Sequence, residues 1–138
     1  MATASRKRLP WSAKKPDIPT LWKCKIDLLA RGMVLCDSVL FVAGSPDLLG
    51  VAEREAPHPY ARVSAEALRL QREALEGEHG TLLCAFSSAD GAKLSEYKLD
   101  GLPAWDGLIA ARGRLYLTMQ DGTVKCFRGG REDGSSRQ

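Results

Sequence analysis

The chain of 138 residues repeats one arrangement of β-type segments, and this repeat restricts the fold more than any other feature. Gly32 matches Gly107 at a spacing of 75 positions, and Gly80 matches Gly122 at a spacing of 42. The two spacings differ by 33, which is the length of the segment 47–79. The sequence therefore predicts two copies of a unit of about 42 residues, with residues 47–79 inserted into the first copy.

Each copy consists of short apolar strands joined by tight turns. Residues 32–36 and 39–44 predict a hairpin around Asp37-Ser38, and residues 81–99 predict a second hairpin. Residues 21–26 predict one more strand at the front of the chain, while residues 100–107 predict a loop. A period in the forties built from such strands is typical of the four-stranded blades of β-propellers.

The expected fold class is therefore all-β, a partial β-propeller. It consists of two four-stranded antiparallel blades over residues 19–128, with a helical insertion at about 47–79. The strand at residues 21–26 is then a spare outer strand, and the last blade lacks its own outer strand. Such a shift leaves an open strand edge, which folded proteins normally cover.

The insertion holds the one segment with helical character. Residues 64–77 contain good helix formers, with Ser64 as N-cap and Gly77 as the expected end. Leu68 and Leu75 form one apolar stripe, so we expect a helix that lies on the surface. Arg69 and Glu73 are helical neighbours of opposite charge.

The two ends differ from this body in composition. Residues 1–18 are basic, without periodicity, and are expected to be a disordered tail, and residues 129–138 are expected to be a flexible C-terminal tail. The first 17 residues carry five basic side chains against Asp17, so the body is nearly neutral although the chain has a formal charge of +3. A nearly neutral body does not favour binding of nucleic acid.

Composition excludes several other classes of protein. No apolar run is long enough for a membrane span, and the start of the chain lacks the apolar segment of a secretory signal. The localisation stays open. The four cysteines do not form a CxxC pair, so we predict no metal site and expect buried thiols in strands, with an inter-strand disulfide as the alternative.

A family resemblance rests on the second hairpin and on the segment after it. The stretch GTLLCAFSSADGAKLSEYKL resembles the repeat of PQQ-like (quinoprotein-type) β-propellers in Gly80, Ala85-Phe86, Asp90-Gly91, Lys93 and Tyr97. Tyr97 stands where these repeats usually have a docking Trp. The stretch LPAWDGLIAARGRLYLTMQDGTVKCF resembles the following blade in bacterial members. The resemblance implies the propeller fold. Enzymes of this family bind PQQ and calcium, and many members work outside the cytoplasm.

Three residues are the candidate ligand-binding site: Trp105, Asp106 and Arg31. Trp105 and Asp106 precede an expected innermost strand, and Arg31 holds the matching place in the first copy. An indole, a carboxylate and a guanidinium near the axis of a propeller can hold a polar planar ligand. The alternative is that Trp105 packs between blades and Asp106 caps a turn. No catalytic, cofactor-binding or metal-ligating residues are predicted.

The sequence leaves three functional hypotheses. The first is a non-enzymatic scaffold or interaction module, the C-terminal part of a larger PQQ-like repeat protein whose partners are other blades. The second, implied by the resemblance, is part of a quinoprotein dehydrogenase that binds PQQ and calcium. The third is a ring of several copies in which the front strand of one copy completes the last blade of the next.

Overall fold

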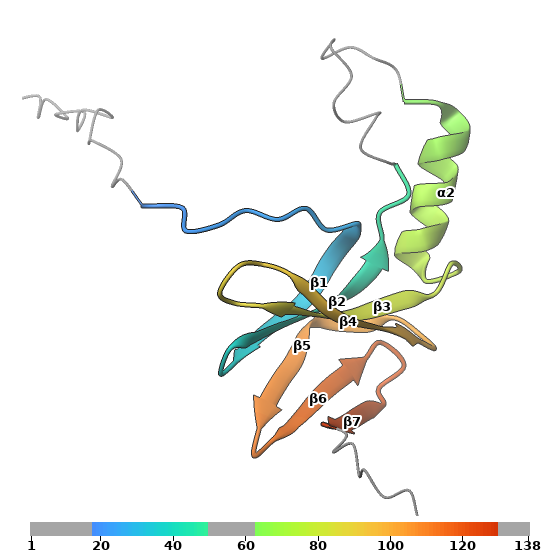
Figure 1. The fold of residues 1–138 in the computed structure, drawn as a ribbon. Coiled ribbons are helices and arrows are strands. Elements are labelled where there is room, and N and C mark those ends of the chain that lie inside the picture. The colour runs from blue at the N-terminus through green and yellow to red at the C-terminus, as the bar shows by residue number, and fades with distance from the viewer. Residues whose placement is uncertain (1–17, 50–62, 130–138) are drawn as a thin grey trace, which may run out of the picture.

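A computed structural model describes residues 18–49 and 63–129 of the chain (Figure 1). It contains seven strands and one helix in this part. In chain order they are β1 (Leu28–Cys36), β2 (Val39–Pro46), α2 (Ala65–Glu76), β3 (Thr81–Ser87), β4 (Lys93–Leu99), β5 (Pro103–Ala111), β6 (Arg114–Met119) and β7 (Val124–Arg128).

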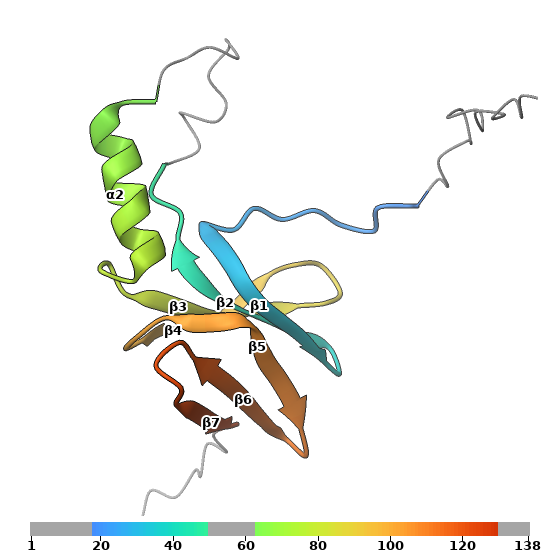
Figure 2. The same ribbon diagram turned by 180° about the vertical axis from the view of Figure 1, so that it is seen from behind.

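The strands form two antiparallel sheets, as the sequence predicts. The first sheet has four strands in the order β1-β2-β3-β4, and the second has three in the order β5-β6-β7. The sheets pack face to face, and β1 and β5 are their closest strands (Figure 2). Neighbouring strands of each sheet are consecutive in the chain and antiparallel. Short turns join them, except between β2 and β3, where the connection contains α2.

The spacing of 75 positions reappears in the pairing of the strands. Met33 pairs with Val42 in the first sheet, and Leu108 pairs with Leu117 in the second. The bounds of β1 and β5 are also 75 positions apart at both ends. The hairpin β1–β2 and the hairpin β5–β6 therefore share one register, and the predicted repeat is present in the backbone.

The other spacing is wrong by one residue. Leu40 pairs with Phe86 in the first sheet, and Leu115 pairs with Phe127 in the second. Strand β7 therefore follows β3 at 41 positions, not 42. The match of Gly80 to Gly122 therefore gives a spacing one residue too long, and a slip of one residue assigns each side chain of β7 to the wrong face of the sheet.

The main core lies between the two sheets. Its buried members are Ala43, Leu83, Leu99, Leu108, Leu115, Leu117 and Met119. A second, smaller cluster lies on the opposite face of the first sheet and contains Leu28, Val42, Cys84 and Phe86. Both faces of the first sheet thus carry apolar side chains, as in a sheet that packs on two sides.

Gly32 permits the close approach of β1 to β5. A β-carbon built on Gly32 would lie 3.2 Å from the β-carbon of Leu108. The β-bulge between Ala30 and Gly32 sits at the same place. A side chain here would make a tight contact with Leu108 that local shifts would have to relieve, so the glycine favours the close contact between the sheets.

The helix forms where the sequence predicts it. The Ser64 side chain accepts a hydrogen bond from the Ala67 N–H, and Gly77 ends the helix in the left-handed conformation. The predicted apolar stripe is wrong, because Leu68 is 54% exposed and the buried helical residues are Gln71 and Ala74. The Gln71 amide accepts from the N–H groups of Leu48 and Leu49, which attaches the helix to the end of β2.

The strand predicted over residues 21–26 is absent. Residues 18–27, here called the arm, run extended from the start of β1 past the β3–β4 hairpin without a strand partner in the described part of the chain (Figure 1). The Trp22 indole holds the arm, because its N–H donates to the Ser88 carbonyl at 2.7 Å. A β-carbon on Gly91 would lie 2.8 Å from the same indole ring.

Three other expectations need correction or placement. The loop predicted over residues 100–107 is shorter, because β5 already begins at Pro103. The expectation of buried thiols holds only for Cys84, since Cys24 and Cys126 are exposed, and all four cysteines are free. The tails expected over 1–18 and 129–138 lie outside the described residues except for Ile18 and Gly129.

We expect the Leu117→Ala variant to lose about 2–5 kcal/mol of unfolding free energy, because Leu117 is fully buried between the sheets. Leu68 lies on the exposed side of α2 and is 54% exposed. The control Leu68→Ala should therefore change stability by less than about 0.5 kcal/mol. Urea unfolding followed by circular dichroism measures both, and equal losses would contradict the observed core.

Candidate binding cleft between the sheets

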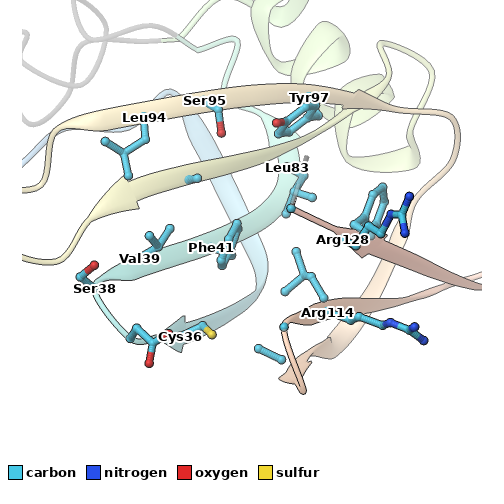
Figure 3. Close-up of a pocket in the computed structure, with 17 residues that line it drawn as sticks. Cys36, Ser38, Val39, Phe41, Leu83, Leu94, Ser95, Tyr97, Arg114 and Arg128 are labelled. Carbon is cyan, nitrogen blue, oxygen red and sulfur yellow. The ribbon is translucent and has the colours of Figure 1, made fainter. Parts of the chain in front are cut away.

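A hollow lies between the two sheets, where they diverge toward their outer strands. It has a volume of about 560 Å³. The inner part of its wall is apolar and includes Phe41, Leu83 and Leu115. The rim carries Leu94, Ser95 and Tyr97 from β4 on one side and Arg114 and Arg128 on the other (Figure 3).

The cleft is open because the two sheets differ in width. The first sheet ends in a fourth strand, β4. Among the described residues, the second sheet has no fourth strand to lie opposite it. Leu94 and Tyr97 are consequently more than half exposed, although both belong to the cleft wall. β7 is therefore an edge strand whose outer backbone groups lack a strand partner within the described residues.

One ion pair links the two sheets through residues that do not line the cleft. The Lys125 ammonium on β7 donates to the carboxylate of Asp100, which follows β4. Lys125 lowers the pKa of the Asp100 carboxyl below its ordinary value through this hydrogen bond. The pair ties β7 to the loop that connects the two sheets.

A second hollow lies under the arm, on the other face of the first sheet. Ile26, Leu82, Phe86 and Glu96 are among its lining residues. The buried Cys84 thiol lies 3.8 Å from a Glu96 carboxylate oxygen, and Lys93 pairs with the same carboxylate at 2.8 Å. Burial raises the pKa of the Cys84 thiol, and the Glu96 charge adds to that rise.

The structure brings together two of the three predicted site residues. The Arg31 guanidinium lies 4.8 Å from the centroid of the Trp105 ring, a cation–π contact. Asp106 lies in the bulged part of β5, is exposed, and has a φ of 53°. Trp105 is 66% exposed. None of the three residues lines the cleft between the sheets.

Arg31 is held mainly by backbone carbonyl groups. It is buried, and its guanidinium donates to the Pro103 carbonyl at 3.3 Å and to the Leu75 carbonyl at 2.8 Å. Leu75 belongs to the last turn of α2, where free carbonyls and the helix dipole favour a cation. Arg31 thus joins β1 to both α2 and β5, while its Nε lacks a hydrogen-bond partner.

These residues do not fit PQQ with a calcium ion. Across residues 18–49 and 63–129, no three His, Cys, Asp or Glu side chains come together in a group that could hold a metal ion. The terminal nitrogens of Arg31 are directed to two main-chain carbonyls.

The helix α2 is not long and apolar enough to cross a membrane, and the described residues hold no other candidate span.

The cleft itself was missed from the sequence. Its walls come from strands of both copies, and the residues that form its rim look like ordinary strand residues. The one available signal was the missing outer strand of the second copy, which implies an uncovered edge.

No protein-family model, curated protein or solved structure matches the chain.

We expect Arg31→Lys to lower the unfolding free energy by about 1–3 kcal/mol, because an ammonium cannot reach both carbonyl groups in the same geometry. Arg69 is an exposed arginine on α2 that pairs with Glu66 and Glu73. The control Arg69→Lys should cost less than about 0.5 kcal/mol, as exposed ion pairs contribute little. Thermal and urea unfolding measure both, and equal losses would contradict a structural role for Arg31.

A thiol reagent should distinguish the cysteines. The thiolate is the reactive form, so the raised pKa and the burial of Cys84 predict slow modification. Cys24 and Cys126 are exposed and should react first with Ellman's reagent at pH 8. The slow phase should be missing in Cys84→Ala and should become fast in urea. A fast Cys84 in the folded protein would contradict the packing of this face.

Proposed function

We propose that the chain is a non-enzymatic scaffold and interaction module, built from two blades of the PQQ-like propeller type, which acts by stacking against further blades. The observation that carries this proposal is the common register of the two hairpins. Met33↔Val42 and Leu108↔Leu117 are the same pair at a spacing of 75 positions. Repeated sheets with one register can use the same kind of contact again on each side.

The exposure of equivalent residues supports the stacking. Leu108 is 4% exposed because its face packs on the first sheet, while its equivalent Met33 is 66% exposed on the far face of that sheet. In the opposite direction, Val34 packs against the main core, while its equivalent Ile109 is 61% exposed. The chain thus buries one contact between repeats and leaves both halves of another uncovered.

Photo-crosslinking in the cells that make the protein tests the interaction module. A benzophenone amino acid is placed at Met33 or at Ile109, and at Leu68 on the exposed side of α2 as a control of similar exposure. Adducts with a protein, identified by mass spectrometry, are expected at the two sheet positions and not at Leu68. Equal labelling at all three positions, or no adduct, would contradict the proposal.

Quinone binding tests the competing enzyme hypothesis. The purified chain is titrated with PQQ in the presence of calcium, and absorbance and melting temperature are followed. We expect neither quantity to change, because the described residues do not bring together a set of carboxylates for the metal. A saturable shift that needs calcium would favour a part of a quinoprotein dehydrogenase.

A further inference from the structure

We infer that the free edge of β7 is a strand-acceptor site, and that its occupant is the arm of a second copy of this chain. This inference rests on the proposed function and names the partner and the contact. The chain carries at one end of the described part a segment that lacks a sheet, and at the other end a sheet with three strands.

The arm corresponds to β4 at the same spacing of 75 positions. Trp22 then corresponds to Tyr97, and Lys23 corresponds to Lys98. The arm continues directly into β1, just as β4 leads into β5. It is therefore in the place of an outer strand, although the described residues hold no sheet to which it belongs, and it is anchored through the Trp22 contact.

The arm exposes an apolar side chain that a second copy can cover. Leu21 is 90% exposed, whereas Trp22, next in the chain, lies partly buried on the turn between β3 and β4. An extended segment that is anchored on one side keeps its backbone groups available for pairing on another. β-strand addition to a free edge uses such groups, and neighbouring pockets select the side chains.

The acceptor side is continuous with the existing contact between the sheets. Leu83 and Leu115 belong to the main core, and the partly buried Phe127 packs against it. All three also line the cleft beside β7. A fourth strand on β7 would lie next to this cleft, opposite Leu94 and Tyr97 of β4 (Figure 3). It would give the second sheet the same width as the first.

A second copy also covers the two open faces. Ile109 on the outer face of the second sheet and Met33 on the outer face of the first are the halves of one repeated contact. When the arm of a second copy pairs with β7, its first sheet follows at the place where the next repeat belongs. The contact is head-to-tail, so it can build a ring or an open chain of copies.

The repeat predicts which residues of β7 lie opposite which residues of the second copy's arm. Ala85 pairs with Ser95 between β3 and β4. Ala85 of β3 corresponds to Cys126 of β7 at a spacing of 41 positions, and Ser95 of β4 corresponds to Thr20 of the arm at 75 positions. Cys126 therefore lies opposite Thr20 of the second copy. Leu21 then faces Lys125, with its side chain on the other side of the strand.

Cross-linking of the full chain tests this register. Thr20→Cys in a Cys24→Ser background should form an intermolecular disulfide with the native Cys126 under mild oxidation, since directly opposite residues have β-carbons about 4.5–5.5 Å apart. The matched control Leu21→Cys, in the same background, should form this disulfide poorly. Non-reducing gels and peptide mass spectrometry identify the bond and show whether it joins two copies.

The oligomeric state gives a second readout that does not depend on cysteine chemistry. Sedimentation at increasing concentration should show a mass above that of one chain. Met33→Glu and Ile109→Glu should weaken association at least about tenfold, the change that a loss of about 1.4 kcal/mol produces. Leu68→Glu should associate like the unmodified chain.

The results separate this inference from the proposed function. The inference that the arm of a second copy pairs with β7 is overturned by either of two results. One is a chain that stays monomeric at all concentrations, and the other is equal cross-linking of Thr20→Cys and Leu21→Cys. If photo-crosslinks at Met33 and Ile109 then lead to a different protein, the interaction module stands without self-association. A disulfide within one chain would also overturn the inference, because it would place the arm on its own β7.

Discussion

The contact between β1 and β5 is the interaction on which the rest of the structure depends. These strands can approach because Gly32 has no side chain, and the bulge at Ala30 and Gly32 brings the glycine next to Leu108. The approach creates the layer between the sheets in which Leu117 is fully buried. Because burial of apolar area is the dominant favourable term in folding, a chain with two separate sheets becomes one packed body.

The same contact explains why the outer strands diverge. The sheets are closest at β1 and β5, and each strand away from them adds twist and separation. The cleft opens where β4 has no fourth strand of the second sheet opposite it in the described chain. Outside the cleft, Arg31 joins β1 to β5 and to the last turn of α2.

Strand order, turns and helix ends could be predicted because they depend on neighbours in sequence. Asp37 has a positive φ in the β1–β2 turn, and Ser64 and Gly77 bound the helix, as their residue types suggest. The helix face was predicted wrongly, because a polar residue, Gln71, is buried to satisfy the N–H groups of Leu48 and Leu49. Of the candidate site, sequence reasoning placed Arg31 near Trp105, but it did not find that carbonyl groups engage the guanidinium.

The sequence by itself determined the repeat and its interruption, since periodic apolar residues and turn residues act locally. Only the tertiary structure decided which residues of each copy are covered. Met33 and Leu108 are equivalent in the repeat, yet one is exposed and the other is buried, because a neighbouring sheet covers only one of them. The arm follows the same logic: residues 21–26 have the composition of a strand, but strand formation needs a partner backbone.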